Sequence, residues 1–174
     1  MIDKSPHNGK EPQIHPSAFI AKNAVVIGDV IIGEGANIWF SAVIRGDVGH
    51  IEIGKNTSIQ ENCTVHAEEG ETCIIGDNCI VGHNAMVHGP CTVGDDVLVG
   101  ISSVILQGSN VKSGCVVGAG AVVRGDTDAN SLYVGIPAKK KKDLGSDSPA
   151  RNRPAALGYA ENGKKFKDAN LGHD

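Results

Sequence analysis

Residues 75–94 read IGDNCIVGHNAMVHGPCTVG, and this stretch decides the fold. A β-branched aliphatic residue recurs in it at every sixth position, and the same period runs through most of the chain. Ile or Val holds this marked position in seventeen hexads, interrupted by one slip of three residues and one of four: Ile20, Val26, Ile32, Ile38, Ile44, Ile53, Ile59, Val65, Ile75, Val81, Val87, Val93, Val99, Ile105, Val111, Val117 and Val123. So short and regular a period indicates a solenoid, in which stacked coils share one core.

A second slot, two residues before the marked position, holds mostly small residues. Residues two apart in a strand point to the same side, so both slots are expected to face inward. All five cysteines occupy the second slot, which predicts small buried hydrophobes rather than metal ligands or disulfide partners: Cys63, Cys73, Cys79, Cys91 and Cys115. The residue after the marked position is Gly in seven hexads, which favours sharp, crowded corners.

Six-residue faces joined by corners close most simply as a triangular prism with three hexads to a coil. The coils are then spaced by about 4.8 Å, as in hydrogen-bonded strands. The seventeen hexads predict an all-β parallel β-helix of five to six coils over residues 18–126. The two slips, around residues 47–50 and 67–70, are expected to be loops pushed out at corners.

The two ends lack the repeat. Residues 1–17 are interpreted as an N-terminal arm and residues 127–174 as a C-terminal tail that packs on the β-helix. The tail contains the run Lys139–Lys142, interpreted as a solvated face, and then a linker over residues 146–154. A short helix is compatible with residues 155–167, although two glycines within it lower the helix propensity.

Composition and charge exclude several partners. The formal net charge is −4, and no basic stripe with interleaved aromatic residues is present, which argues against nucleic acid. No segment approaches the roughly 18 apolar residues of a membrane span, and the first residues lack the apolar core of a signal peptide. We therefore expect a soluble cytoplasmic protein.

The repeat brings polar residues into line on one outer face. The fifth, eighth and eleventh hexads lie on this face in successive coils, and their outward residues after the marked position are Arg45, His66 and His88. Two imidazoles about 4.8 Å apart can converge on one metal ion. His83 borders a different face, so a neighbouring chain related by three-fold symmetry would have to supply it. Trp39 points outward on the face that His83 borders, which favours a subunit interface and hence a homotrimer.

Three segments carry a resemblance to a known family: NIWFSAVIRGD at residues 37–47, IQENCTVH at 59–66 and GHNAMVHG at 82–89. They resemble the γ-class carbonic anhydrases, and the likeness covers about residues 12–140. The resemblance implies a left-handed β-helix and hydration of CO2 to bicarbonate by metal-activated hydroxide. Three neutral imidazoles with an open fourth position are a known catalytic zinc arrangement. The resemblance implies Zn2+, with Fe2+ or Co2+ as alternatives, ligated by His66 and His88 of one subunit and His83 of the next.

The same resemblance implies roles for four further residues. Arg45 and Asp47 would form an ion pair across subunits, and Gln60 would hydrogen-bond the attacking hydroxide. The repeat places Gln60 on the face of the hexad that carries His83, so both are expected to come from one subunit. Tyr159 lies in a segment similar to the C-terminal helix of the family, where a tyrosine approaches the site. The loop after His66 holds three candidate proton acceptors: Glu68, Glu69 and Glu71.

Departures from the family pattern keep other functions open. Val48 follows Asp47, where the best-studied subclass has Glu, and the acidic loop is short. Both features resemble the shorter subclass, whose members are often weak or redox-dependent anhydrases. A hexapeptide acyltransferase with one His as general base is one alternative. A non-catalytic trimeric metal-binding scaffold is another. The segment VGIPAK at residues 134–139 is common to anhydrases and transferases and does not discriminate between them.

Overall fold

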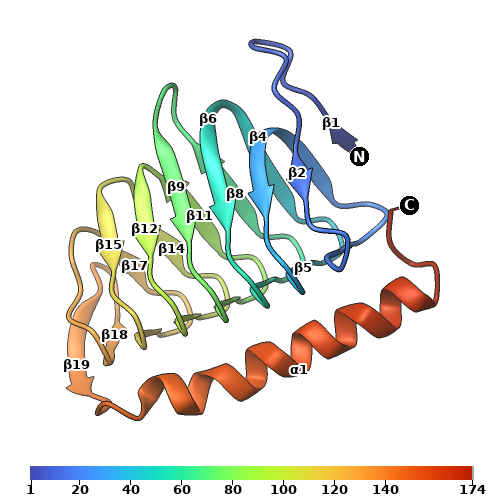
Figure 1. The fold of residues 1–174 in the computed structure, drawn as a ribbon. Helices are drawn as coiled ribbons and strands as arrows, with labels where there is room; N and C mark the ends of the chain where they lie inside the picture. The colour runs from blue at the N-terminus through green and yellow to red at the C-terminus, as the bar shows by residue number, and fades with distance from the viewer. Residues whose placement is uncertain (174) are drawn as a thin grey trace.

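The computed structural model describes residues 1–173 and consists of stacked strands with one long helix along their side (Figure 1). The last residue of the predicted tail, Asp174, lies outside the described residues. The elements are β1 (Ile2–Asp3), β2 (Gln13–Ile14), β3 (Phe19–Ile20), β4 (Val25–Ile32), β5 (Asn37–Ile38), β6 (Val43–Ile53), β7 (Ser58–Ile59), β8 (Thr64–Ala67), β9 (Thr72–Ile75), β10 (Ile80–Val81), β11 (Met86–Gly89), β12 (Cys91–Val93), β13 (Leu98–Val99), β14 (Val104–Ile105), β15 (Ser109–Val111), β16 (Val116–Val117), β17 (Val122–Val123), β18 (Ser131–Val134), β19 (Lys139–Asp143) and α1 (Ser148–Asp168).

The strands form the hexapeptide-repeat β-helix that the sequence predicts, so the fold class is confirmed. Along one face the order is β3-β5-β7-β10-β13-β16-β18, all parallel, and antiparallel β19 closes the end. These seven parallel rungs exceed the predicted five to six coils. The seventh rung is β18, which joins this face after the repeat ends, and β2 adds a strand to the other sheet by pairing with β4. Strand β18 does not continue the six-residue pattern, whereas Ile14 of β2 lies six residues before Ile20 and extends the pattern by one position.

The core is a narrow column of aliphatic and small side chains. Ile38, Ile44 and Ile59 at the marked position are fully buried, and the five cysteines of the second slot are buried and free, as predicted. Burial raises the pKa of the Cys63 thiol to about 11 and that of Cys79 to about 12. Both groups therefore remain neutral thiols at physiological pH, in keeping with a packing role.

The glycines after the marked position serve close approach between coils rather than unusual backbone angles. A Cβ on Gly54 would lie 2.5 Å from the carbonyl oxygen of Gly76 in the next coil. The left-handed backbone of the corner falls two residues later, on Asn56 (φ 54°) and Asn78 (φ 54°). Asn tolerates this conformation better than most residues. The corners are thus crowded, as expected, but their bend depends on another position.

The two slips have different structures. The prediction of a loop at residues 47–50 is wrong, because β6 runs through them as one strand and pairs with β4 on both sides of a register shift. The extra residues are absorbed there as a bulge. The second slip contains a turn at residues 69–70 and is the predicted loop. Its Gly70 N–H donates to Val48 O (3.0 Å), and His50 N–H donates to Glu71 O (2.8 Å), so the two insertions stack on each other.

The ends of the chain are more ordered than their sequence indicates. Both β1 and β2, within the predicted arm, pair with β4. Helix α1 begins at Ser148, inside the predicted linker, and its 21 residues exceed the expected short helix. Gly163 allows this helix to lie against the prism, since a Cβ there would be 2.9 Å from Asn37 Cβ. Within residues 1–173, no helix has both the length and the apolar character needed to cross a membrane.

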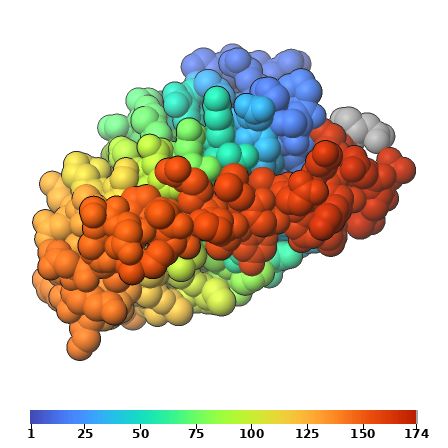
Figure 2. Space-filling model, turned by 60° about the horizontal axis from the view of Figure 1, so that its bottom comes forward, coloured from blue at the N-terminus to red at the C-terminus, as the bar shows by residue number. Residues whose placement is uncertain are grey.

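Helix α1 runs back along the stack from the last coils to the first (Figure 2). At its start Ser148 Oγ donates to Gly114 O (2.7 Å), and in its second turn Arg153 forms an ion pair with Asp96 (2.7 Å). Near its end Phe166 packs edge-on against Phe19, with ring centroids 5.9 Å apart. The helix thereby covers the face formed by β3, β5 and β7.

Trp39 lies beneath this helix. Its ring packs edge-on against Phe166 (centroids 5.1 Å apart), and its indole N–H donates to Asn37 Oδ1 (2.7 Å) and Ser58 Oγ (3.1 Å). Only 4 % of its surface is exposed. The prediction that Trp39 faces a neighbouring subunit is therefore wrong: the residue points away from the prism, but the chain's own helix covers it.

Candidate metal centre

The predicted ladder of Arg45, His66 and His88 is present on one face of the prism. Arg45 on β6 is the register partner of His66 on β8, and His66 is the partner of His88 on β11. The two imidazole rings lie side by side with centroids 5.5 Å apart and an angle of 47° between their planes. The six-residue period forces this arrangement, because each ring extends from the same position of successive coils.

The orientation of His66 is fixed by the backbone. Its Nδ1 lies 2.7 Å from the carbonyl oxygen of Arg45. A carbonyl only accepts hydrogen bonds, so Nδ1 carries the proton and Nε2 keeps a free lone pair. Metal-ligating histidines are commonly oriented in this way by a bond from their other ring nitrogen. With 7 % of its surface exposed, His66 is held as a preformed donor.

Glu68 stands next to this pair. Its Oε1 is 3.2 Å from Nε2 of His88, and one ligand atom from each of His66, Glu68 and His88 can be chosen so that all lie within 4.8 Å of one another. The structure thus brings two imidazoles and a carboxylate together within a single chain. These are donors that Zn2+ and related divalent ions accept.

Arg45 and Asp47 form an ion pair within the chain, and the pairing across subunits that the resemblance implied stays a prediction. Nη1 of Arg45 donates to both carboxylate oxygens of Asp47, at 2.8 and 2.9 Å. The two residues lie two apart on β6, which places both side chains on one side of the strand. Burial alone would raise the pKa of Asp47, but the hydrogen bond and charge of Arg45 outweigh it and lower the pKa. The carboxylate therefore stays ionised, 3.9 Å from Nδ1 of His66.

A second group of predicted site residues lies at a different face. Gln60 is 4 % exposed, and its Oε1 accepts a hydrogen bond from the backbone N–H of His83 (3.1 Å), so these two residues meet within one chain as expected. Nδ1 of His83 is 2.8 Å from Oε2 of Glu61. Gln60, His83 and Tyr159 of α1 line one cavity of about 480 Å³, whose remaining wall is mostly aliphatic, with Leu98 and Val116 among the lining residues.

The predicted site is therefore divided into two halves. One half contains His66, His88, Arg45 and Asp47, and the other contains Gln60, His83 and Tyr159. The first half lies on strands of one sheet. In the second half Gln60 and His83 follow β7 and β10 of the other sheet, and Tyr159 lies on α1. Within residues 1–173 no hydrogen bond or ion pair joins the two halves.

Two carboxylates with site contacts were not assigned as partners of the histidines from the sequence. Glu61 precedes His83 by 22 residues, the same offset that separates His66 from His88. That shared offset is a signal for their contact, because it places Glu61 and His83 at one position of successive coils. Glu68 was expected only as a proton acceptor in a loop, since its approach to His88 depends on how that loop turns.

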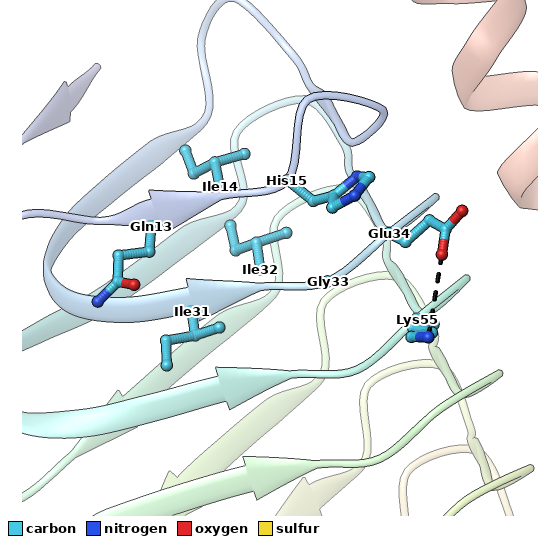
Figure 3. A pocket seen from close by; sticks show the side chains of 8 residues that line it. All are labelled: Gln13, Ile14, His15, Ile31, Ile32, Gly33, Glu34 and Lys55. Atoms are coloured by element: carbon cyan, nitrogen blue, oxygen red, sulfur yellow. Dashed lines mark ion pairs between the residues drawn. The ribbon is translucent and has the colours of Figure 1, made fainter.

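A separate hollow of about 510 Å³ lies over β2 and β4 (Figure 3). The side chains of Ile14, Ile31 and Ile32 line it, and an ion pair between Glu34 and Lys55 (3.9 Å) lies at its edge. None of the predicted site residues lines this hollow. A large volume alone does not indicate a functional site, so the two halves described above remain the candidate centre.

Comparison with known proteins finds relatives among both carbonic anhydrases and hexapeptide transferases. The bacterial transferase hexapeptide (six repeats) model matches residues 11–46. The chain is 47 % identical over 76 residues to a probable carbonic anhydrase of Methanocaldococcus jannaschii, covering 44 % of this chain and 48 % of that protein. It is 38 % identical over 159 residues to the mitochondrial gamma carbonic anhydrase 1 of Arabidopsis thaliana, covering 87 % of this chain and 58 % of the relative.

A solved structure resembles almost the whole chain. It is a hexapeptide transferase family protein from Anaplasma phagocytophilum, 31 % identical with a TM-score of 0.88, and the match covers 95 % of this chain and 98 % of that one. By contrast, the chain spans about half the length of the curated relatives it matches first, 46 to 48 %.

Proposed function

The chain belongs to the γ-class carbonic anhydrase family of hexapeptide-repeat proteins, and from this premise we propose that it hydrates CO2 to bicarbonate at a metal centre shared between subunits of a homotrimer. The observation that carries the proposal is the side-by-side placement of His66 and His88, with ring centroids 5.5 Å apart. A hexapeptide transferase needs one histidine as a base and has no use for a convergent pair.

The donors present fit a divalent metal. His66 offers Nε2 because its Nδ1 is bound to a carbonyl oxygen, and His83 is oriented by Glu61 in the manner of a carboxylate–histidine–metal triad. In the proposed centre His66 and His88 of one subunit and His83 of the next would hold the ion, which we expect to be Zn2+, with Fe2+ or Co2+ as alternatives. Such an ion lowers the pKa of coordinated water to about 7 and so supplies a nucleophile at neutral pH.

The other residues of the two halves would orient and polarise the substrate. Oε1 of Gln60 is engaged by the backbone of His83, while its Nε2 has no partner among residues 1–173 and can donate to an oxygen atom in the cavity. The Tyr159 side chain lines the same cavity. The walls of this cavity are mostly aliphatic, which suits an uncharged molecule such as CO2. Arg45 holds Asp47 ionised beside His66, which favours the proton on Nδ1 of that ring. Because the two halves do not meet within one chain, the proposal requires a neighbour.

The proposal is tested on metal-loaded protein by stopped-flow CO2 hydration, metal analysis and solution mass. We expect a trimer, and we expect His83→Ala to reduce kcat/KM by about 100-fold or more, beyond the range for loss of an outer-shell partner. His15→Ala is the matched control, since His15 lines the separate hollow of Figure 3. A monomer, or a His83→Ala variant with full activity, would refute the shared centre.

An acyltransferase is the second candidate, supported by the similarity to the Anaplasma protein over nearly its full length. Acyl transfer from acetyl-CoA that persists in His66→Ala and His88→Ala, without any hydration of CO2, would favour it. A scaffold without activity would bind the metal and fail both assays. Location in the cytoplasm stays a prediction.

A further inference from the structure

The carboxylate of Glu68 gives the histidine pair a third donor from the same chain. Glu68 follows β8 in the loop of the second slip, and its Oε1 is 3.2 Å from Nε2 of His88. His66, the register partner of His88, completes a group whose ligand atoms lie within 4.8 Å of one another. The proposed function leaves this carboxylate without a role.

The spacing of these donors suits a common metal ion. Bonds of about 2.0–2.2 Å from the ion to nitrogen and oxygen, at a tetrahedral angle, place two donor atoms about 3.4 Å apart. The distance of 3.2 Å between His88 and Glu68 is already close to this value. Other pairs of ligand atoms in the group lie up to 4.8 Å apart and must move closer together to bind one ion. The Glu68 side chain is 49 % exposed, so it has room for this movement.

Neighbouring residues hold Glu68 near the histidines and leave one of its carboxylate oxygens free for a metal ion. Nε2 of Gln107, from a coil further along the stack, donates to Oε1 of Glu68 at 3.4 Å, and Oε2 of Glu68 has no protein partner among residues 1–173. The neighbouring residues 69 and 70 form the turn that returns the chain to β9. The backbone of this turn is fastened to β6 by the bond from Gly70 N–H to Val48 O. Glu68 therefore approaches His88 from a loop with a defined path.

We infer that Glu68 is a metal ligand, so that a single chain binds a divalent ion through His66, His88 and Glu68 without His83 from a neighbour. The inference rests on the proposed role of His66 and His88 as ligands. Two histidines and one carboxylate are an established donor set for Zn2+ and for Fe2+. Metal binding then does not require subunit assembly, and His83 of a neighbour would add a further ligand to the same ion.

Co2+ is the probe, because its visible absorption reports the donors around it and its affinity can be titrated without any turnover. The starting protein is the full chain with His83→Ala, in which the ligand from a neighbour is removed. Glu68→Gln in this background removes the carboxylate charge and keeps the side chain's shape. Glu69→Gln in the same background is the matched control, since Glu69 belongs to the same loop but not to the donor group.

We expect the His83→Ala protein to bind one Co2+ per chain. The added Glu68→Gln should weaken binding by about 100-fold or more and change the absorption spectrum, because losing an outer-shell partner alone already costs 10- to 100-fold. The added Glu69→Gln should leave both unchanged. Equal affinity of the His83→Ala protein with and without Glu68→Gln would overturn the inference. So would a His83→Ala protein that binds Co2+ no better than a His66→Ala variant.

These outcomes are independent of the proposed activity. Wild-type protein that binds Co2+ through Glu68 but does not hydrate CO2 would refute the anhydrase function and leave this inference standing. Protein that hydrates CO2, but whose Co2+ affinity is unchanged by Glu68→Gln, would refute the inference and leave the function standing.

Discussion

Oε2 of Glu61 lies 2.8 Å from Nδ1 of His83, one coil away on the same corner of the prism. This contact fixes the imidazole so that Nε2 is left for a ligand. The His83 side chain is 42 % exposed, so its orientation depends on this one carboxylate more than on packing.

Removal of Glu61 should weaken metal binding while every proposed ligand remains in place. We expect Glu61→Ala to reduce the metal affinity of the assembled protein by about 10- to 100-fold, the usual effect of losing an outer-shell partner. Competition with a chromophoric chelator measures this affinity. Glu34→Ala removes the same charge from an exposed pair with Lys55 and should change nothing, and an equal effect of both variants would contradict the prediction.

The Tyr159 hydroxyl should contribute to turnover and not to stability. Among residues 1–173 this hydroxyl has no hydrogen-bond partner, although the ring packs against Trp39 with centroids 6.3 Å apart. Tyr159→Phe keeps the ring, so the melting temperature should stay constant. The loss of one hydrogen bond to substrate, about 0.5–1.5 kcal/mol, should lower kcat/KM by up to about tenfold. A variant with unchanged kcat/KM would remove Tyr159 from the site.

The two glycines of α1 should respond in opposite directions to the same substitution. Gly163→Ala forces a Cβ to within 2.9 Å of Asn37 Cβ and should destabilise the protein by about 1–3 kcal/mol. Gly158 has open space around it, so Gly158→Ala should stabilise the helix by about 0.5–1 kcal/mol. Urea unfolding monitored by circular dichroism measures both, and two variants of equal stability would argue against this docking of the helix.

His50 should make part of the stability depend on pH. Burial acts to lower its pKa, but hydrogen bonds and charge from Glu52 on β6 (3.0 Å) and Asp29 on β4 (3.1 Å) raise it above its ordinary value of 6.5. Lys10, from the N-terminal arm, pairs with the same Asp29 at 2.6 Å.

Because the folded state raises this pKa, the stabilisation is complete below pH 6.5 and is lost as pH rises through the raised value. His50→Gln should remove this part of the difference in unfolding free energy between pH 6 and more alkaline solution. Denaturant titrations of both proteins across this range provide the measurement. An identical pH dependence in wild type and variant would exclude His50 as its source.

The six-residue period predicted the parts of the structure that it controls directly. It placed His66 beside His88 and Arg45 next to His66, because any residue at a given position of the coil must lie over its counterpart one coil away. It also assigned the cysteines to the core, since their slot faces inward in every coil.

The parts that were missed depend on contacts outside the repeat. Helix α1 has a weak pattern of its own and is held by the prism through Phe166 and Arg153, so its length could not be derived locally. The burial of Trp39 follows from that helix and was missed with it. The ion pair of Arg45 with Asp47 closes within the chain because β6 stays extended where a loop was expected.

The course of α1 has a mechanical consequence for the whole molecule. In a solenoid each coil touches only its neighbours, so terminal coils can fray one at a time. Here a single brace is fastened near the last coils at Gly114 and near the first at Phe19. Separation of any intermediate pair of coils would pull this brace from one of its anchors. The stack should therefore melt in one concerted transition rather than peel from either end.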